Sequence, residues 1–405
     1  MNRLHRTFVV VLALGLVLPL GAQAFPWMIK HNYVGCQVCH VDPSGAGLLT
    51  AYGRAQTELL LQSQYGKPKS DGSVSASTGF LLGAVKLPDE VPMQAAVRVG
   101  AMLNRTAAPG SDARDSIVPL QMVTDLRVGY INDWLRASAS AGVVIKRAQL
   151  AALFPRSTDD GVKLVAREFW AGASVADNQL LIRAGRMNLP FGLRNPEHTL
   201  WVRSATRTDT NEDQQYGLSV NFTGEAIRAE VMGVAGNFQI GPEVYREKGA
   251  VGFAEYAFAP NFAAGLQFLA LGAGADVELR TRSPFRQAYG AFARYGLSHE
   301  LALMAELDVL HYAAEDREGA LGATGLIQAD FEVVRGLHLM VTGEFLRDAA
   351  PDQYGIQRGG WVGLAWFAAQ GVEVRLDGII RQFPQGENLP DLSNLILLSQ
   401  VNLYF

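Results

Sequence analysis

The chain of 405 residues contains, near its end, the stretch Val372-Glu373-Val374-Arg375-Leu376-Asp377-Gly378-Ile379-Ile380-Arg381. Apolar and charged side chains alternate along it with a period of two, the pattern of a β-strand with one apolar and one polar face. Residues 337–348 repeat the pattern. Periodicity alone leaves two interpretations open. In a soluble sandwich the apolar face would be the inner one, whereas in a membrane barrel it would face outward.

The same alternation recurs from about residue 92 to the end, and we count about 16 candidate strands. They start near residues 92, 117, 133, 164, 178, 213, 225, 248, 261, 284, 299, 321, 336, 356, 371 and 392. Alternate joins are tight, near Asn132, Asp177, Gly224, Pro260, His299, Gly336 and Gly371. The joins between those are long, including residues 148–163, 188–212 and 237–247. Short turns at one end, long loops at the other and an even strand count are typical of bacterial outer-membrane barrels.

The last strand supports this interpretation, since its apolar residues alternate and it ends in Tyr404 and Phe405, which resembles the terminal signature of outer-membrane barrel proteins. We therefore predict an all-β fold, with a transmembrane antiparallel barrel over residues 92–405 and a linker over residues 67–91.

The first 24 residues predict an export signal. A basic start is followed by an apolar run over residues 8–20 and by Ala22-Gln23-Ala24, which has the form of a cleavage site. A membrane anchor is the alternative, but about 13 apolar residues are too few to cross a bilayer. The mature protein would begin at Phe25, and we expect it in the outer membrane of a Gram-negative bacterium. With a net charge of −4 and no long basic run, nucleic acid is not an expected partner.

The only two cysteines lie in Cys36-Gln37-Val38-Cys39-His40, the attachment pattern of a c-type haem. The two thiols would form thioethers with the porphyrin, and His40 would be the proximal ligand of the iron. An oxidising compartment would also permit a disulfide between them. A thioredoxin-type pair would need a βαβ context, and a zinc site would need further ligands nearby.

Residues 25–66 are predicted to form a small α-helical monohaem cytochrome segment. Leu48, Tyr52, Ala55 and Leu59 recur at helical spacing and predict a short helix with one apolar stripe. Arg54 is a candidate partner of a haem propionate, with a solvated surface arginine as the alternative. The segment is too small to bury a haem alone, so it is expected to lean on the rest of the chain.

The motif, followed by Pro43, Leu49, Tyr52, Gly53 and Arg54, resembles the fused outer-membrane porin–cytochromes. These proteins join one c-type haem to a barrel, and their best-known members oxidise ferrous iron outside the cell. The resemblance implies haem roles for Cys36, Cys39 and His40 in an electron carrier rather than a classical enzyme. It also implies periplasmic cytochromes or other soluble electron carriers as partners, with an extracellular donor or acceptor. Iron oxidation rests on the resemblance alone, because the sequence contains no motif of an iron site.

The longest loop follows Met187, and arginines cluster in and around it: Arg183, Arg186, Arg194, Arg203 and Arg207. One interpretation folds this loop into the barrel, where its arginines meet haem propionates or anions. The other leaves it on the surface. The candidates for a second axial ligand are Met28, His31, His198 and His338, of which we favour His198 in the long loop.

Three functions remain after these observations. The first is an electron-transfer protein whose haem lies on the periplasmic side of the barrel or inside it. The second is a diffusion porin with a periplasmic haem-binding plug or sensor domain. The third is a haem enzyme such as a peroxidase, which would need an open iron site.

Overall fold

The computed structural model describes residues 25–45, 47–63, 80–81, 84–107, 109–110, 112–145, 162–197, 199–276, 278–349, 355–385 and 390–404. The expected export signal, most of the expected linker, His198 and Phe405 lie outside these residues. Within the described ranges, no helix has the length and apolar character needed to cross a membrane.

The described chain is mostly strand. The strands are β1 (Met93–Ala107), β2 (Arg114–Ile131), β3 (Leu135–Ile145), β4 (Val162–Val165), β5 (Phe169–Val175), β6 (Leu180–Met187), β7 (Gln215–Thr223), β8 (Ile227–Gly236), β9 (Lys248–Ala259), β10 (Phe262–Gly272), β11 (Phe285–Gly296), β12 (Leu301–Ala314), β13 (Arg317–Val334), β14 (Leu337–Arg347), β15 (Gln357–Ala369), β16 (Val372–Phe383) and β17 (Leu392–Tyr404). The helices are η1 (Pro26–His31), η2 (Cys36–Val38), α2 (Ala51–Leu61), α3 (Trp201–Thr206) and η3 (Glu243–Tyr245).

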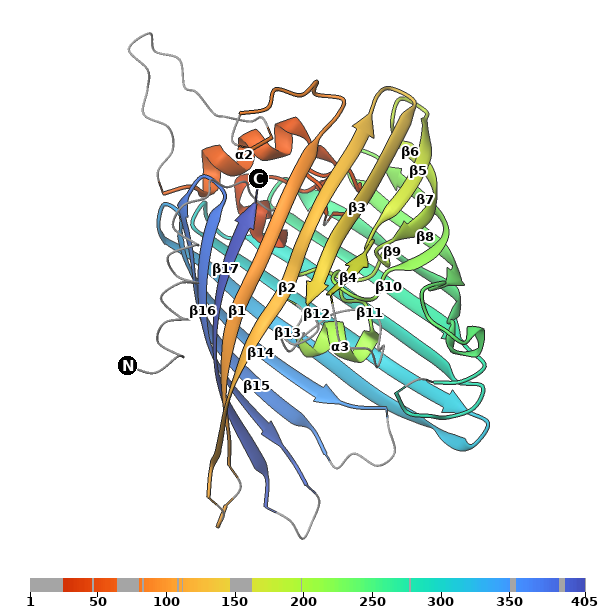
Figure 1. Ribbon diagram of the computed structural model, residues 1–405, viewed down its shortest axis with the longest axis vertical. Helices are drawn as coiled ribbons and strands as arrows, with labels where there is room; N and C mark the ends of the chain where they lie inside the picture. Colours follow the sequence, from red (N-terminus) through yellow and green to blue (C-terminus); the bar gives the residue numbers. More distant parts are fainter. Residues whose placement is uncertain are drawn as a thin grey trace.

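All strands belong to one antiparallel sheet that closes on itself, because β1 pairs with both β2 and β17 (Figure 1). β4 and β5 both pair with β3 and occupy one place in the barrel, so the 17 segments make 16 strands. The break between them falls at Arg167 and Glu168, whose side chains are both buried. Their backbone N–H groups donate to Ser140 Oγ at 3.0 and 2.9 Å. The prediction of a 16-strand antiparallel barrel is confirmed.

Every expected strand start falls within four residues of an observed one. The expected tight joins are observed, and they share what we call the short-turn end of the barrel. One join at the opposite, long-loop end departs from the expected asymmetry, since only residues 315–316 connect β12 and β13. The short-turn end faces the periplasm in bacterial barrels of this kind.

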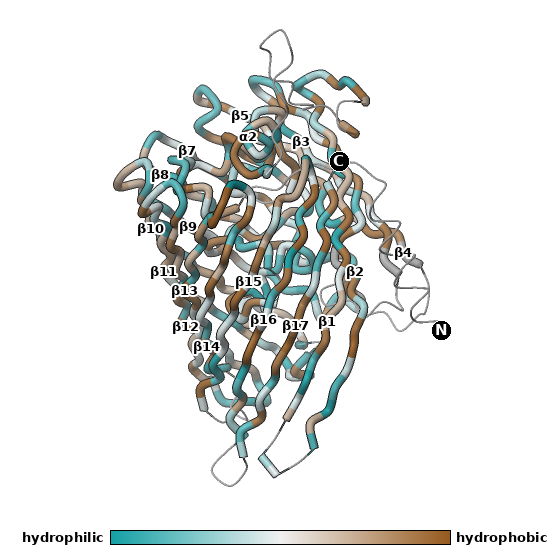
Figure 2. Tube along the Cα trace, turned by 90° about the vertical axis from the view of Figure 1, so that its left-hand side faces the viewer, coloured by the Kyte–Doolittle hydropathy of each residue, from teal (hydrophilic) through white to brown (hydrophobic). Residues whose placement is uncertain are grey.

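The outward-facing positions of the strands are mostly apolar, although apolar side chains such as Met340 and Trp361 also lie inside the barrel. In β16, Val374 and Leu376 are 39% and 45% exposed, whereas Glu373, Arg375 and Asp377 are buried. The alternation of apolar and polar residues along the strands is visible in Figure 2. A soluble sandwich would bury the apolar face, so this arrangement excludes that interpretation and matches a barrel whose outer face contacts lipid.

The N-terminal segment packs against the short-turn end, where α2 lies near the C-terminus (Figure 1). Lys30 of η1 is buried, and its Nζ lies 2.8 Å from an Asp330 carboxylate oxygen of β13. Ser63 N–H, just after α2, donates to Phe367 O of β15 at 3.0 Å. The expectation that this segment leans on the rest of the chain is confirmed.

The sequence predicted that the apolar stripe of α2 would be its buried face, and this prediction is wrong. Tyr52 and Leu59 are 46% and 41% exposed, while Arg54, Thr57 and Glu58 are buried. The reason is that α2 packs on the polar mouth of the barrel, where Gln370 donates a hydrogen bond to Glu58. The polar face of α2 therefore forms the contacts with the barrel.

The long loop between β6 and β7 folds into the barrel, as one of the two interpretations expected. Its helix α3 contacts the inner faces of β12, β13 and β14 (Figure 1). Arg203 of α3 forms a buried ion pair with Glu306 of β12. The Trp201 N–H donates to a Glu344 carboxylate oxygen of β14 at 2.9 Å. The loop thus narrows the lumen from within.

Candidate functional site

A small cavity of about 60 Å³ lies where the N-terminal segment, the long loop and the barrel wall meet. Cys36, Cys39 and His40 all line it, together with Gly192 and Leu193 of the long loop. The structure therefore places the whole sequence motif at one enclosed site inside the barrel.

A tight turn holds the motif. The N–H groups of Cys39 and His40 both donate to Cys36 O, at 3.1 and 2.9 Å. Thr50 N–H donates to Cys39 O at 2.9 Å, and the Thr50 side chain caps α2 by accepting from Gly53 N–H. These bonds bring the motif and the start of α2 together, so the helix and the turn form one unit.

Two glycines permit the close packing around this turn. A Cβ on Gly53 would lie 2.1 Å from Cys39 O, a distance that no side chain tolerates. Gly45 has a φ of +95°, and a Cβ there would lie 3.2 Å from Cys36 Sγ. Gly53 belongs to the stretch that carries the porin–cytochrome resemblance. Its close contact with Cys39 O explains why this position needs a residue without a side chain.

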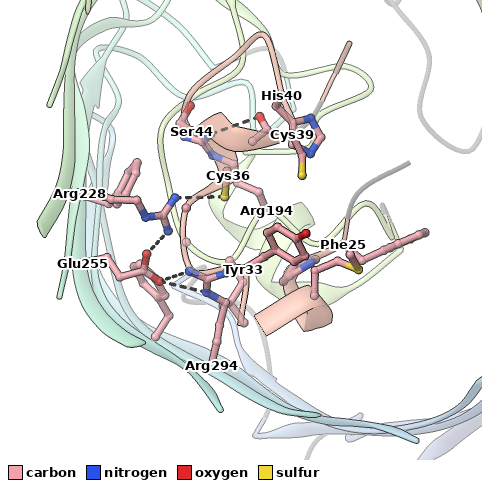
Figure 3. A pocket seen from close by; sticks show the side chains of 18 residues that line it. Phe25, Tyr33, Cys36, Cys39, His40, Ser44, Arg194, Arg228, Glu255 and Arg294 are labelled. Carbon is pink, nitrogen blue, oxygen red and sulfur yellow. Dashed lines mark hydrogen bonds and ion pairs between the residues drawn. The ribbon is translucent and has the colours of Figure 1, made fainter. Parts of the chain in front are cut away.

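Arginines from the barrel wall reach the motif. Arg228 of β8 donates from Nη1 to Cys36 Sγ at 3.1 Å, and it also pairs with Glu255 of β9. Arg294 of β11 lies 2.7 Å from the other oxygen of Glu255 and donates to Val34 O at 2.9 Å. Figure 3 shows Arg228 beside the Cys36 sulfur, with Glu255 and Arg294 below them.

A third arginine comes from the long loop. Arg194 lines the cavity and is only 7% exposed, and its guanidinium lies 5.4 Å from the ring centre of Phe253. Its Nη1 makes one long contact, 3.5 Å to Gly45 O. Its Nε and Nη2 are buried without a hydrogen-bond partner among the described residues.

The two thiols have different environments, and neither is in a disulfide. Burial raises the pKa of Cys36, but Arg228 and Arg294 outweigh this effect and hold the pKa below its usual value. Burial raises the pKa of Cys39 to about 11, and the neighbouring Cys36 adds to the rise. Positive charge therefore dominates the environment of Cys36, whereas burial dominates that of Cys39.

The candidate axial ligands and the candidate propionate partner Arg54 lie at several separate places in the structure. Met28 is buried and lines the cavity. Arg54 does not line it, since its guanidinium donates to Met93 O at the start of β1. His31 lies near the short-turn end, with its ring 6.3 Å from that of His299. His338 faces the lumen as expected, but it lines a neighbouring cavity and contacts Asp330 at 3.1 Å.

Sequence reasoning missed Arg228, Glu255 and Arg294. Each occupies an inward position of an alternating strand, and that alternation is the one signal that marks them as lumen residues. No local sequence feature distinguishes these three residues from the other charged residues at inward positions. In the described part of the chain, no group of three or more His, Cys, Asp and Glu side chains is arranged to hold a metal ion.

The residues of the cavity fit a haem. Two free thiols and a histidine supply the attachment set, and the buried guanidinium of Arg194 has two nitrogens without a hydrogen bond to the described residues. A haem bound here would supply one-electron chemistry at its iron.

No protein-family model matches the chain, and no curated protein matches its sequence. Solved structures do match its fold. A loop-deletion mutant of OmpT, an outer membrane protein of Vibrio cholerae, has a TM-score of 0.54 and 10% identity over 78% of this chain and 99% of that chain. The anion-selective porin from Comamonas acidovorans has a TM-score of 0.53 and 13% identity over 78% of this chain and 100% of that chain. The outer membrane channel DcaP of Acinetobacter baumannii has a TM-score of 0.52 and 11% identity over 79% of this chain and 99% of that chain.

At identities this low, the likeness concerns the fold alone. The chain has the outer-membrane porin-like fold, a closed antiparallel β-barrel of 16 strands.

Proposed function

We propose that this protein is an outer-membrane electron carrier with one covalent c-type haem inside its barrel. The observation that carries the proposal is the shared cavity, in which Cys36, Cys39 and His40 meet buried arginines of the wall and of the long loop. In an open pore these positions would face water. Here the N-terminal segment and the loop enclose them.

Each motif residue has a defined task in this proposal. The sulfurs of Cys36 and Cys39 hold the porphyrin as thioethers, and an imidazole nitrogen of His40 ligates the iron. The loop residues Gly192 and Leu193 line the cavity beside the motif. A lipid core about 30 Å thick blocks electron transfer unless a redox centre lies within it, which is why a haem inside a barrel would be useful.

The placement of the segment suggests how partners would reach the haem. The motif lies nearer the short-turn end, so soluble periplasmic electron carriers would approach from there. The extracellular donor or acceptor would approach from the long-loop end. Ferrous iron as that donor is supported by the porin–cytochrome resemblance alone.

For the second axial ligand we favour Met28, which is the one sequence candidate among the described residues that lines the cavity. His198 lies outside those residues and remains the alternative. A His–Met pair raises the reduction potential of a haem, which suits the acceptance of electrons from a donor of high potential.

A diffusion porin is the second candidate, and the comparisons support it directly. The matched structures include one named as an anion-selective porin and one named as a channel. The arginines inside the barrel would then attract anions. The N-terminal segment would act as a plug or sensor domain.

Haem attachment separates the two candidates. We expect the protein to keep its haem stain after denaturation, and the double variant Cys36→Ser with Cys39→Ser to lose it, because thioethers are the covalent link. The loaded protein in liposomes should pass electrons to an enclosed acceptor, and the double variant should not. Absence of covalent haem from the unmutated protein, with anion conductance in planar bilayers, would establish the porin instead.

The axial ligand is tested by absorption spectroscopy. Met28→Ala should convert a low-spin haem to a high-spin or water-ligated one without detaching it. His198→Ala serves as the matched comparison, and we expect it to leave the low-spin spectrum unchanged. The reverse result would assign His198 as the ligand.

A further inference from the structure

The helix α2 carries an exposed apolar face at the short-turn end. Tyr52 and Leu59 are 46% and 41% exposed, and Val38, between the two cysteines, is 44% exposed. The Thr50 hydroxyl donates to Val38 O at 3.2 Å, so the motif and the start of α2 lie side by side. We call Val38, Tyr52 and Leu59 the α2 patch. Because α2 packs on the polar mouth of the barrel, this patch is not part of the lipid-facing wall (Figure 1).

Two tyrosines connect the α2 patch with the cavity. Tyr33 lines the cavity, and its hydroxyl lies 3.0 Å from that of Tyr52. The Tyr33 hydroxyl also donates to Gln56 Oε1 at 2.9 Å, which holds the ring against α2. A path of contacting side chains therefore leads from the motif to the exposed surface.

The segments that join the strands at the short-turn end carry an excess of negative charge. Their exposed carboxylates, which we call the acidic rim, are Asp89, Glu90, Asp133, Asp177, Glu225 and Glu300. The exposed cations in the described parts of the same segments are Lys86 and Arg335. A positively charged protein would therefore be attracted to this end of the barrel.

An apolar centre surrounded by polar and charged groups is the usual anatomy of a protein–protein interface. Weak electron-transfer complexes bury less than about 1,200 Å² in total, so a small apolar patch is enough for them. Complementary charge raises the rate of such encounters and selects among partners. The charge of the acidic rim thus points to a basic protein as the occupant.

We propose that the α2 patch and the acidic rim form the docking surface for a soluble, positively charged electron-carrier protein. This inference rests on the proposed function, since the carrier would exchange one electron with a haem in the cavity. The electron moves from one iron to the other, and no bond forms or breaks. The α2 patch contacts the apolar surface around the carrier's own redox centre, while the acidic rim aligns its cationic side chains.

The test is the affinity of a basic soluble c-type cytochrome for the full-length protein in nanodiscs of zwitterionic lipid. The same cytochrome with its lysines succinylated is the probe of reversed charge. At low ionic strength we expect the basic form to bind about tenfold more tightly or better, and the difference should vanish near about 0.5 M salt. The rate at which the loaded, reduced protein reduces the ferric cytochrome should follow the same order.

The acidic rim is tested by the triple variant Asp89→Asn, Glu90→Gln and Asp133→Asn. Binding of the basic cytochrome at low ionic strength should weaken about tenfold, because each exposed charge contributes modestly and three are removed. The matched control is the triple variant Glu243→Gln, Glu315→Gln and Glu318→Gln, which removes exposed carboxylates at the long-loop end. We expect the control to bind like the unmutated protein.

The α2 patch is tested by Leu59→Ser. Binding should weaken about fivefold at low and at high ionic strength alike, since salt does not screen an apolar contact. Val244→Ser is the matched control, because Val244 is 44% exposed at the long-loop end. We expect it to leave binding unchanged.

Equal affinity for the two probes, or an equal loss in the two triple variants, would overturn the docking surface while haem attachment stands. Self-association of the protein that Leu59→Ser abolishes would also overturn it and would assign the α2 patch to a second copy of this chain. An unmutated protein without covalent haem would instead refute the proposed function, whichever probe it binds.

Discussion

Gly53 of α2 packs directly against the backbone of Cys39. In most helices an alanine would be favoured over glycine by about 1 kcal/mol. Here the added methyl would meet Cys39 O at 2.1 Å and the Cys39 Cα at 2.7 Å. Overpacking costs about 1–3 kcal/mol, and a backbone carbonyl held by Thr50 N–H cannot turn away as a side chain can.

We therefore expect Gly53→Ala to destabilise the contact between α2 and the motif by up to about 2 kcal/mol, the difference between these two effects. The measurement is haem stain per mole of barrel, which should fall because the turn no longer presents both thiols. Gly360→Ala is the control, since no atom lies within 4 Å of a Cβ at that position. A yield equal to that of the control would show that the contact has no role in attachment.

At the scale of elements, one carboxylate of β12 holds the long loop at two points. Glu306 of β12 pairs with Arg203 of α3 and accepts from Leu193 N–H at 2.9 Å. Removing one partner of a buried ion pair costs about 3–5 kcal/mol, because the other charge stays buried alone. An exposed pair contributes only about 0–1 kcal/mol.

Glu306→Ala should therefore loosen the loop and increase ion conductance in planar bilayers. Asp115→Ala is the control, because Asp115 and Arg105 form an exposed pair at 3.8 Å. Unchanged conductance in Glu306→Ala would mean that other contacts keep the loop in the lumen.

The docking of α2 should depend on pH through Glu58. Burial raises the pKa of Glu58 from its ordinary 4.5 to about 7, although Gln370 and Arg54 oppose the rise. Because the folded state holds the proton more tightly than the unfolded state, stability is full below about pH 4.5 and falls as the pH rises towards 7.

Hydrogen exchange of the α2 amides, corrected for intrinsic rates, should show less protection at pH 8 than at pH 5. Glu58→Gln should remove most of this difference, because the amide stays neutral. Glu243→Gln, an exposed position at the long-loop end, should behave like the unmutated protein. An equal pH effect in Glu58→Gln would place the responsible group elsewhere.

At the scale of the whole molecule, the barrel has an apolar outside, a polar inside and two unlike ends. The short-turn end carries the N-terminal segment, and the opposite end carries most of the long joins. In bacterial barrels the long joins face the cell exterior.

A tag inserted at Gly110, in the join between β1 and β2, should thus be detected on intact cells. A tag at Asp177, in the tight turn between β5 and β6, should be detected only after the outer membrane is permeabilised. Both positions are exposed turns, so each serves as the control for the other. The opposite labelling would invert the barrel and place the N-terminal segment outside the cell.

The sequence by itself determined the elements and the attachment motif. The period of two follows from backbone geometry within each strand, so strand positions, the strand count and the tight turns were predictable without tertiary information. The spacing of Cys36, Cys39 and His40 is likewise local, and it predicts a haem before any fold is known.

Only the tertiary structure decided which face of each element is inside. Val374 and Glu373 alternate identically in a sandwich and in a barrel, and closure of the sheet turned the charged side inward. For the same reason α2 buries Glu58 and exposes Leu59. Arg228 and Arg294 meet Cys36 across some 190 to 260 residues of chain, because barrel register, which no local pattern encodes, brings β8 and β11 to the cavity.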